Sequence, residues 1–534
     1  IYGKECEFYP ELKISHKLSK LKEGEPDTLF GIIDLAIIDK TGQIHYFDYK
    51  SSPKDYSKFD TAKKRTYTYQ LAMYGKLLRK YGLDYRNSDI GILPIQFQDL
   101  QLLNPEEAHS DPSKAKFGYK DICALWKAEN FDPDALMEQY YKSGARYFVA
   151  QASHHDHFFN FASDYNRFNS VEIGPHKDIC GMWKAAAKKY NLPFGMTEHL
   201  GASFAWWRTN KGSDSHGPYA GVPYDGNDPA YRDFYHDNYQ HVAKPGESDK
   251  WVWLTENEKF HEYWLKVMKE IIDKYEPDLL YSDSWLPFGE NFESVENKDF
   301  RYGLEAVAYL YNKSEKIYGK NMAVYTQKSR KQEIYEVGVL DIERSQLPDI
   351  SPVPWQSETC IGDWFYNARA KYKKPRHVID ILIDTIAKNG TMLLNILQKP
   401  DGTVDEETMY LLKELEKWFA VNSEAVYGTR PWRVSGEGSS QVIIEGFTEE
   451  QVPWREDDFR FVQKNGKLYA FMMGMKLGKT VVIKSIRDDE RVTSVRLLSV
   501  GELAFMQHAG LLIVELPKEM PTPYANALEI SFEI

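Results

Sequence analysis

The sequence contains few cysteines and lacks the motifs of several large enzyme classes. Its four cysteines lie far apart without a CxxC pair, which argues against both a zinc ribbon and a dense disulfide framework. The central part of the chain has no Gly-rich phosphate loop, no G-x-S-x-G elbow and no H-E-x-x-H motif, so phosphoryl transfer, serine hydrolysis and zincin chemistry are disfavoured. No apolar run approaches the roughly 18 residues that a membrane span requires, and we expect no such span.

The composition also lacks an excess of positive charge. A net charge of -12 over 534 residues disfavours nucleic acid as a partner. Aromatic residues make up 14% of the chain, which favours carbohydrate, because aromatic faces stack on sugar rings. A chain of this length predicts two or three domains. The sequence leaves the oligomeric state and the compartment open.

Residues 1–100 are expected to form a small α/β segment. Two strand-like runs, 32–39 and 43–50, flank a Lys-Thr-Gly turn and predict an antiparallel hairpin. The apolar spacing in TAKKRTYTYQLAMYGKLLRKYGL predicts a helix, and IGILPIQF predicts a further strand. Residues 101–112 are polar and rich in turn formers, so we interpret them as a linker.

Residues 113–425 alternate strand-like runs with amphipathic helices. Strands are expected in RYFVAQAS, PFGMTEHL, DLLYSDS, MAVYTQ, GVLDIE and GTMLLNI, with helices such as WLKVMKEIIDKY between them. This alternation predicts βα units with a mostly parallel sheet, closed as a TIM-like (β/α) barrel. Over 426–534 the helical patterns stop, and short strand-like runs separated by turn residues predict an antiparallel β-sandwich.

Polar residues end several apolar runs of the expected barrel. In such a barrel the reactive groups lie at the carboxyl ends of the strands, and four polar ends in succession are harder to explain as strand caps than one. Glycoside hydrolysis needs two carboxyl groups across the scissile bond, one ionised and one protonated, in a pocket of aromatic and hydrogen-bonding residues. The strand-end residues that suit this chemistry are His154, His155, Glu198, His199, Asp283, Asp341, Glu343 and Arg344.

Several segments together resemble a known family. In order, the chain contains ARYFVAQASHHDHFFNFAS, GMTEHLGASFAWW, PDLLYSDSWLPFG, PWQSETCIGDWFY, NGTMLLNILQKPDGTV and AVYGTRPW. Over residues 113–534 it thus resembles glycoside hydrolase family 29, the α-L-fucosidases. The resemblance implies a (β/α) barrel followed by a β-sandwich, a fucosylated glycan as substrate, no cofactor, and retaining hydrolysis through a covalent fucosyl-enzyme.

The same resemblance implies roles for individual residues. Asp283 matches the nucleophile of the family's YxDG strand, and Glu343 is the favoured acid/base, with Glu358 as the alternative. Because Glu358 stands beside Trp355 and Cys360, it also fits a residue that only braces a loop. For Trp355 and Trp364, packing in the core is as good an interpretation as a place in the wall of the sugar pocket. The substrate-binding residues that the resemblance implies are His154, His155, Glu198, His199, Trp355 and Trp364.

One motif of that family is missing. The family's barrels open with a strand that carries a KFGIFxHWG-like motif, whose His contacts the sugar, and this chain contains no HWG. The resemblance begins around KFGYKDICALWKAENFD, after the position of that strand. We therefore expect a barrel that is incomplete at its first strand, so hydrolytic activity itself has to be tested.

The N-terminal segment resembles a different family, the RecB-like branch of the PD-(D/E)XK nucleases. Asp34 in GIID, Asp48 and Lys50 in DYK, and Gln70 with Tyr74 on the expected helix match its G-x-x-D, D-x-K and Q-x-x-x-Y pattern. The resemblance implies that Asp34 and Asp48 hold Mg²⁺ through oxygen ligands. Lys50 would then orient or activate the attacking water, and Gln70 would help to position the site.

Three functions are compatible with these patterns. We favour a retaining exo-glycoside hydrolase that releases α-L-fucose, for which a secreted or periplasmic location would be typical. The first alternative is a Mg²⁺-dependent nuclease that carries an inactive barrel. The second alternative is a protein that binds fucose or a fucosylated glycan without cleaving it.

Overall fold

The structure is a computed structural model, and the chain divides into two compact units. These are Ile1–Tyr119 with Ser215–Pro223, and Lys120–Asp214 with Tyr224–Ile534. The described residues are 7–17, 28–38, 44–51, 90–95 and 118–533, except 209–210, 213, 216–219, 222, 238–253, 256, 289–300, 330–336, 369, 441, 443–450 and 475–478.

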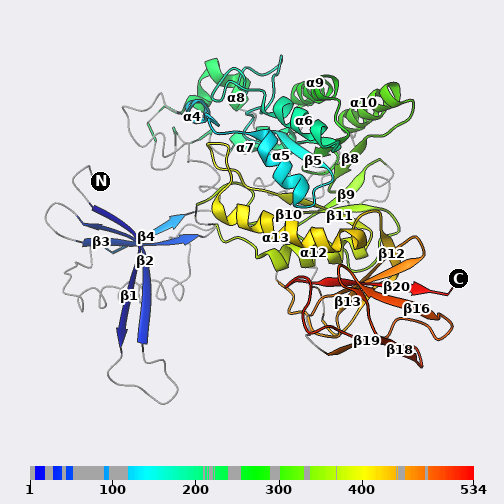
Figure 1. Cartoon of the computed structure of the whole chain (residues 1–534). Coiled ribbons are helices and arrows are strands. Elements are labelled where there is room, and N and C mark those ends of the chain that lie inside the picture. Colours follow the sequence, from blue (N-terminus) through cyan, green and yellow to red (C-terminus); the bar gives the residue numbers. More distant parts are fainter. Residues whose placement is uncertain are drawn as a thin grey trace, which may run out of the picture. The chain divides into compact units, whose positions relative to one another are not determined.

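The first unit contains a four-stranded sheet in the order β1-β2-β3-β4 (Figure 1). Its strands are β1 (Glu7–Lys17), β2 (Thr28–Ile38), β3 (Ile44–Ser51) and β4 (Ile90–Ile95). β2 and β3 pair antiparallel, with Leu35 opposite Phe47 and Ile38 opposite Ile44, which confirms the predicted hairpin. β4 runs parallel to β3 and confirms the strand predicted in IGILPIQF. The predicted helix, with Gln70 on it, lies outside the described residues.

The second unit is organised around a seven-stranded parallel sheet in the order β11-β10-β9-β8-β7-β6-β5. Its strands are β5 (Phe148–Ser153), β6 (Phe194–Glu198), β7 (Leu279–Ser282), β8 (Val324–Gln327), β9 (Val339–Glu343), β10 (Trp355–Cys360) and β11 (Gly390–Asn395). Six of them confirm predicted strands. The exception is β10, whose polar residues Gln356, Ser357 and Glu358 hide the apolar pattern of a buried strand.

This sheet is open among the described residues. β5 and β11 stand at its two ends, and each pairs with one neighbour only. A complete TIM barrel has eight strands, so the arrangement is a TIM-like barrel that is incomplete at its first strand, as predicted. Tyr147, just before β5, reaches across to the opposite end of the sheet and donates a hydrogen bond to the carbonyl of Met392 in β11 (3.0 Å).

Helices pack on the outer face of the sheet. Asp132 and Asp405 cap two of them, because their carboxylates accept backbone N–H bonds in the first turns of α5 and α13. Met137, Trp183 and Met268, from three helices, share one core with strand residues. The main helices are α4 (Tyr119–Leu125), α5 (Pro133–Lys142), α6 (Ile179–Lys189), α9 (Glu258–Tyr275), α10 (Arg301–Tyr318), α12 (Pro375–Ala387) and α13 (Glu406–Asn422).

Shorter helices lie in the long connections of the sheet. They are η4 (Leu200–Ala202), α7 (Ser203–Arg208), η5 (Asp225–Asn227), η6 (Pro229–Tyr231), α8 (Arg232–Tyr235) and η7 (Ser423–Ala425). The connection from β9 to β10, residues 344–354, contains no helix, which makes the barrel irregular. Within the described part of the chain, no helix combines the length and the apolar character that crossing a membrane requires.

The C-terminal strands form two antiparallel sheets that share one apolar core, which confirms the predicted β-sandwich. Phe461 and Leu528 of the larger sheet and Val514 of the smaller one are fully buried in it. The strands are β12 (Arg430–Glu437), β13 (Phe459–Lys464), β14 (Lys467–Met472), β15 (Thr480–Ile483), β16 (Val492–Leu497), β17 (Gly501–Glu502), β18 (Phe505–His508), β19 (Leu511–Glu515) and β20 (Asn526–Phe532).

A buried ion network joins helix α12 to the sandwich. The carboxylate of Asp384 on α12 lies 2.6 Å from Nζ of Lys388, the residue that follows this helix, and 2.5 Å from Nε of Arg460 on β13. The Asp384 side chain is 1% exposed. Since one carboxylate faces two cations away from solvent, the network fixes the position of the sandwich on the barrel helices.

Candidate active site

The carboxyl ends of the parallel strands carry the acidic residues predicted for catalysis. Asp283 directly follows β7, Glu343 ends β9 and Glu358 lies on β10. In the parallel register Glu358 pairs with Glu343, and Gln356 pairs with Asp341. Paired residues of neighbouring strands point to the same face of a sheet. The structure therefore brings these carboxyl groups together on one face.

Lys328, which follows β8, holds this group together. Its Nζ lies 2.5 Å from Oδ1 of Asp283 and 2.5 Å from Oε2 of Glu343, so these two oxygens are at most 5.0 Å apart. Oε2 of Glu358 is 3.6 Å from the same nitrogen. Burial lowers the pKa of Lys328, but the surrounding carboxylates, Asp283 foremost, raise it well above its ordinary value. The amine is therefore a permanent ammonium ion.

The hydroxyl of Tyr281 on β7 meets three carboxyl groups. It lies 2.7 Å from Oε2 of Glu358, 2.9 Å from Oδ2 of Asp341 and 3.3 Å from Oδ1 of Asp283. A hydroxyl has one proton to donate. A second carboxyl group can therefore bond to Tyr281 only by carrying a proton and donating it to the phenol oxygen.

The pKa shifts separate the carboxyl groups into two kinds. Burial, together with the charges of Asp341 and Asp283, raises the pKa of Glu358 well above its ordinary value. Burial also raises the pKa of Asp341 to about 6. For Asp283, burial acts in the same direction, but the ammonium of Lys328 outweighs it and holds the pKa below its ordinary value. Asp283 is therefore ionised, whereas Glu358 retains a proton.

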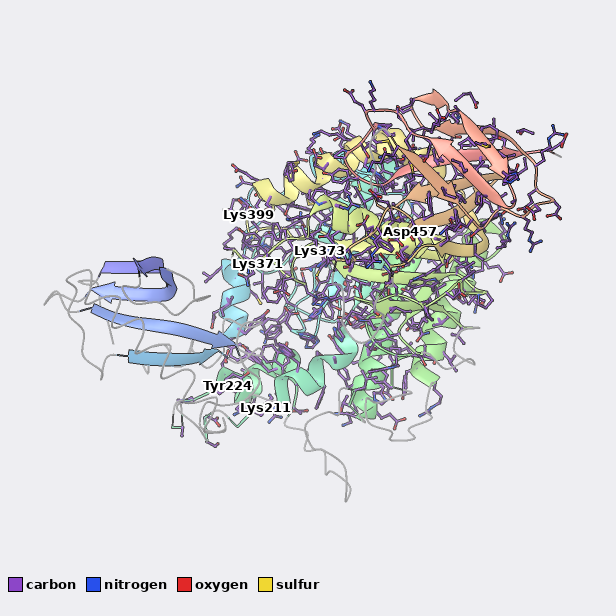
Figure 2. The ribbon with its side chains drawn as sticks, turned by 90° about the horizontal axis from the view of Figure 1, so that it is seen from below. Lys211, Tyr224, Lys371, Lys373, Lys399 and Asp457 are labelled. Carbon is purple, nitrogen blue, oxygen red and sulfur yellow. The ribbon has the colours of Figure 1, made fainter. Side chains whose placement is uncertain are left out.

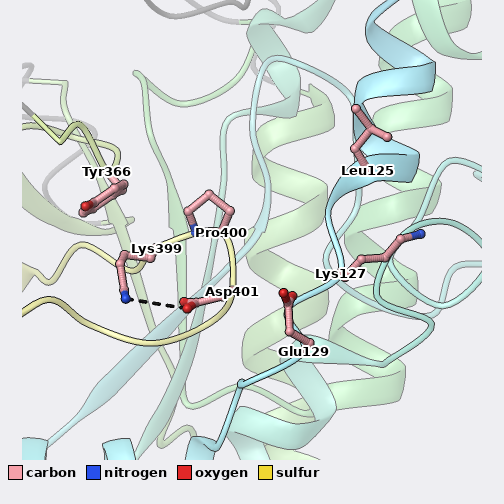
Figure 3. Close-up of a pocket in the computed structure, with 7 residues that line it drawn as sticks. All are labelled: Leu125, Lys127, Glu129, Tyr366, Lys399, Pro400 and Asp401. Atoms are coloured by element: carbon pink, nitrogen blue, oxygen red, sulfur yellow. Dashed lines mark ion pairs between the residues drawn. The ribbon is translucent and has the colours of Figure 1, made fainter. Parts of the chain in front are cut away.

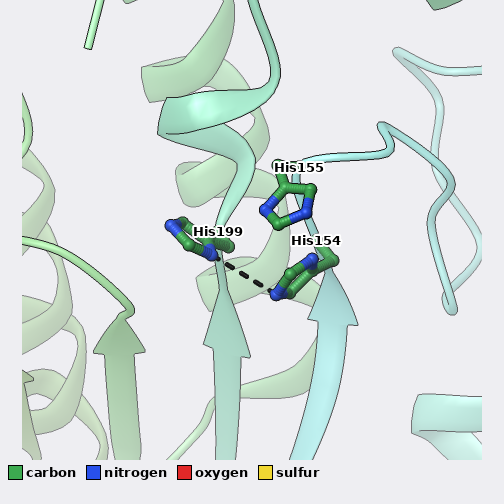
Figure 4. A group of neighbouring side chains, drawn as sticks. All are labelled: His154, His155 and His199. Carbon is green, nitrogen blue, oxygen red and sulfur yellow. Dashed lines mark hydrogen bonds between the residues drawn. The ribbon is translucent and has the colours of Figure 1, made fainter. Parts of the chain in front are cut away.

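Three histidines gather at the ends of β5 and β6 (Figure 4), and one of them, His199, contacts Asp283. His154 and His155 follow β5, and His199 follows β6. Nε2 of His154 is 3.3 Å from Nδ1 of His199, which in turn is 3.4 Å from Oδ2 of Asp283. The ring of His155 stacks on Trp206, with centroids 3.7 Å apart. The structure thus brings together the predicted His pair, His199 and the predicted nucleophile.

Burial keeps these imidazoles neutral. It lowers the pKa of His199 to about 3, and it also lowers the pKa values of His154 and His155. A neutral imidazole offers one N–H donor and one acceptor nitrogen. Such rings can exchange hydrogen bonds in both directions with the hydroxyl groups of a sugar.

Glu198 points away from this group, although it precedes His199 in the sequence. Its Oε2 accepts hydrogen bonds from the backbone N–H of Leu200 (2.8 Å) and from Nε1 of Trp264 (3.2 Å). Burial raises the pKa of Glu198. Successive residues at a strand end face opposite sides, so the carboxyl group braces the turn that carries His199.

The two predicted pocket tryptophans occupy different environments. Trp355 is 1% exposed, and its Nε1 donates a hydrogen bond to the carbonyl of Lys388 (2.9 Å), so the ring packs towards α12. Trp364 is half-buried, and its carbonyl accepts a bond from Asn395 at the end of β11 (3.0 Å). Lys373, labelled in Figure 2, donates to the carbonyl of Cys360 (2.5 Å) and ties the loop of Trp364 to β10.

Three residues of this group are not singled out from the sequence. They are Lys328, Tyr281 and Gln356, whose amide donates a hydrogen bond to Asp341 (2.8 Å). Asp341 is among the strand-end candidates, but it is given no role there. A polar residue after an apolar run was the signal used for the other strand ends, and the same signal marks Lys328 after VYTQ. Tyr281 carries no such signal, because a tyrosine inside a strand is ordinary core material.

A separate cavity of about 350 Å³ lies among loops of the same unit (Figure 3). Lys399 and Asp401, in the loop after β11, form an ion pair across 3.6 Å. The carbonyl of Asp401 accepts a bond from the N–H of Asn130 (2.8 Å). The cavity is lined by Leu125, Lys127, Glu129, Tyr366, Lys399, Pro400 and Asp401. None of them belongs to the predicted set.

The nuclease-type residues of the first unit lie on its central strands. Asp34 is on β2, and Asp48 and Lys50 are on β3. The paired register of these two strands begins with Leu35 opposite Phe47, so Asp34 directly precedes, and Asp48 directly follows, the first paired residues. Gln70 lies outside the described residues.

An open TIM-like barrel with paired carboxyl groups at the carboxyl ends of its strands is the architecture of a barrel-type glycosidase. A sequence model of the family described as Alpha-L-fucosidase matches residues 96–424, more than half of the chain. The chain belongs to this family, glycoside hydrolase family 29, which confirms the resemblance. A second model, that of the PD-(D/E)XK nuclease superfamily, matches residues 5–158 and overlaps the first.

Individual relatives agree with this assignment. The chain is 24% identical to the mouse (Mus musculus) tissue alpha-L-fucosidase over 76% of its own length and 77% of that protein. Identity to the rat (Rattus norvegicus) tissue enzyme is also 24%, over 61% of the chain and 62% of the relative, so the chain spans less than two thirds of that protein. The fold resembles that of the Thermotoga maritima alpha-fucosidase in complex with fucose, with a TM-score of 0.57, 21% identity, and 81% and 87% of the two chains covered.

Proposed function

We propose that this protein hydrolyses α-L-fucosides with retention of configuration, through a covalent fucosyl-enzyme on Asp283. The observation that carries the proposal is the pair of carboxyl oxygens that share one ammonium group. Oδ1 of Asp283 and Oε2 of Glu343 are each 2.5 Å from Nζ of Lys328. Retaining glycosidases hold their two carboxyl groups about 5 to 5.5 Å apart, and inverting ones hold them farther apart.

Asp283 is suited to be the nucleophile because it stays ionised. Lys328 lowers its pKa in spite of burial, and a carboxylate that ends a barrel strand is exposed to a ligand at the carboxyl edge of the sheet. In the first step, one carboxylate oxygen would attack the anomeric carbon of fucose while the leaving oxygen takes a proton. Water would then cleave the ester and release the sugar.

Glu343 is our choice for the acid/base. Its side chain is 26% exposed and that of Glu358 is 13% exposed, so Glu343 is the more accessible to a leaving group and to water. Glu343 lies beside the same ammonium as Asp283, where in our proposal it gives a proton to the leaving oxygen in the first step and takes one from the attacking water in the second.

Glu358 remains the alternative acid. Its pKa is raised well above the ordinary value, which is the property of a proton donor. Its Oε2, however, is already 2.7 Å from the hydroxyl of Tyr281. In our proposal, Glu358 uses this hydrogen bond to hold Tyr281 and Asp341 in place below the reacting carbon.

The histidines would bind the sugar. His154, His155 and His199 are neutral rings that converge (Figure 4), His199 contacts Asp283, and Trp206, which stacks on His155, supplies an apolar wall. We propose that they hydrogen-bond the hydroxyls of a terminal fucose of a glycan. The Thermotoga maritima relative is described in complex with fucose, which supports a monosaccharide ligand of this kind.

The test is the exchange of Asp283 for Asn. The Asp283→Asn variant should lose the hydrolysis of an aryl α-L-fucoside completely, because an amide cannot form the ester. Its circular dichroism and its thermal midpoint should stay close to those of the wild type. Retained turnover would rule out the assignment. Fucose binding by calorimetry with no turnover in the wild type would instead select a binding protein, the function that an incomplete barrel favours.

A Mg²⁺-dependent nuclease is the second candidate, favoured by the superfamily match over residues 5–158. Asp34 on β2 and Asp48 on the neighbouring strand β3 are residues of the oxygen-donor type that Mg²⁺ prefers, so the donor types fit the ion. The ion would polarise the phosphodiester, while Lys50 is placed on the same strand as Asp48. Cleavage of DNA by the full chain that EDTA abolishes, and that Asp48→Asn lacks, would support this activity.

A further inference from the structure

The three histidines, one of which contacts Asp283, are also the one group of three or more possible metal ligands found in the described part of the chain. One ring nitrogen from each of His154, His155 and His199 lies within 4.8 Å of the others. Figure 4 shows the three rings turned towards one another at the ends of β5 and β6. The proposed sugar-binding role does not by itself require this convergence.

The spacing of the donor atoms matches a tetrahedral metal site. Zinc bonds of about 2.0 to 2.1 Å to nitrogen and oxygen place neighbouring ligand atoms about 3.3 to 3.4 Å apart. Nε2 of His154 and Nδ1 of His199 are 3.3 Å apart, and Nδ1 of His199 and Oδ2 of Asp283 are 3.4 Å apart. Two edges of the tetrahedron, which meet at Nδ1 of His199, therefore have the spacing of a metal site, and His155, whose ring nitrogen lies within 4.8 Å of the other two histidines, supplies the fourth ligand by moving closer.

The donor types select the class of metal. Three imidazoles and one carboxylate suit Zn²⁺ and its transition-metal neighbours, whereas Mg²⁺ and Ca²⁺ prefer sites made of oxygen ligands. Lys328 contacts Oδ1 of Asp283, while Oδ2 is the oxygen next to His199. A metal ion can thus bind Oδ2 without displacing the ammonium of Lys328. The positive charge of this ammonium nevertheless repels the metal ion and weakens its binding.

We propose that His154, His155, His199 and Asp283 form a binding site for one divalent transition-metal ion such as Zn²⁺. Occupation by metal and binding of a sugar exclude one another, because the metal takes the imidazole nitrogens and the carboxylate oxygen that the sugar would use. The ion is therefore a reversible inhibitor that competes with the substrate. The binding itself is independent of the proposed function, and only the inhibition rests on it.

Metal binding is measured on the full chain by calorimetry with Zn²⁺ and by the visible absorption of bound Co²⁺. The wild type should take up one equivalent, with Co²⁺ bands of tetrahedral intensity. His199→Gln should weaken Zn²⁺ binding at least tenfold. His508→Gln, at an exposed position on β18 of the sandwich, is the matched control and should leave the affinity unchanged.

A second variant, Lys328→Met, distinguishes the proposed site from metal binding elsewhere on the protein surface. Removal of the ammonium next to Asp283 should tighten Zn²⁺ binding several-fold, because the ion no longer meets a like charge. Equal affinity in the wild type and His199→Gln, or absence of tetrahedral Co²⁺ bands, would overturn the site. If Zn²⁺ binds as expected and no fucoside is cleaved, the metal site stands and the proposed function fails. Activity that is insensitive to bound Zn²⁺ would refute the competition.

Discussion

Two buried ion networks of the second unit differ in how they balance charge. At the junction with the sandwich, one carboxylate, Asp384, faces Lys388 and Arg460, and these side chains are 1%, 4% and 10% exposed. At the carboxyl end of the sheet, one ammonium, Lys328, faces Asp283, Glu343 and Glu358, and Lys328 is 18% exposed. The first network is sealed, whereas the second is open to a ligand.

The difference in charge balance explains which of the two networks is suited to proton transfer. An excess of carboxyl groups around one cation forces some of them to hold protons, so their pKa values spread apart. An excess of cations around one carboxylate has no second carboxyl group within it to compete for the positive charge. The junction network is therefore suited to stability, and the network around Lys328 is suited to proton transfer.

The largest expected effect is on the acid/base pair. Glu343→Gln removes the exchangeable proton and should lower kcat for a natural fucoside about a thousandfold, which is about 4 kcal/mol. Glu358→Gln imitates the protonated side chain that the raised pKa of Glu358 implies, so its kcat should fall only a few-fold. Azide should restore turnover of an aryl fucoside in Glu343→Ala.

The comparison of the two glutamine variants decides the assignment. If Glu358→Gln is the inactive one and azide has no effect on Glu343→Ala, the acid is Glu358. The thermal midpoints of both variants should remain near that of the wild type, because neither change leaves an unpaired charge in a sealed site.

The next effect concerns stability alone. Asp384→Ala leaves Lys388 and Arg460 as unpaired buried cations and should lower the free energy of unfolding by about 3 kcal/mol. Activity per folded molecule at 25 °C should not change, because the network is distinct from the site. The control is Glu138→Ala, which breaks an exposed ion pair with Lys142 and should barely move the denaturation midpoint. Equal midpoints for the two variants would mean that the junction network is not stabilising.

Removal of the ammonium in the site should act on activity more than on stability. Lys328→Met deprives Asp283 of a charge-assisted hydrogen bond worth about 2 kcal/mol, so kcat should fall about thirtyfold. The pKa of Asp283 should rise, because the positive charge that lowers it is gone, and the acid limb of the pH–rate profile should move to higher pH. Lys328→Arg should recover part of the rate. An unshifted acid limb would contradict the role of Lys328.

The elements of the fold could largely be predicted from the sequence, because they depend on local periodicity. The hairpin of the first unit, six strands of the barrel and the sandwich all follow from apolar spacing and turn residues. The strand β10 could not, because Gln356 and Glu358 point inwards to a charged site, where polar residues replace the apolar ones that usually reveal a strand.

Which neighbour in a strand faces the site was harder to predict. His199 reaches Asp283, while Glu198, one residue earlier, bonds to the N–H of Leu200 on the other side. Trp355 likewise packs away from Gln356, which bonds to Asp341. Motif matching takes adjacent residues together, but a strand alternates them between two faces. The sequence alone therefore indicates the strand ends and not the single residues that enter the site.

The last prediction concerns the junction, where Asp380 lies one turn before Asp384 on α12. Burial raises the pKa of Asp380 to about 7, and Nε of Arg376, 3.6 Å away, lowers it only in part. In the unfolded chain the pKa is about 4, so between pH 4 and 7 the folded state binds more protons. The contribution of Asp380 to stability therefore falls as the pH rises through this range.

Asp380→Asn removes this loss, because an amide does not titrate. The variant should match the wild type near pH 4, and its advantage in free energy of unfolding should grow as the pH rises from 4 to 8. The measurement is the denaturation midpoint of both proteins at a series of pH values. A constant difference across the series would mean that Asp380 does not titrate in the folded state. The junction would then hold no exchangeable proton, and the two networks would differ in that capacity as well as in exposure.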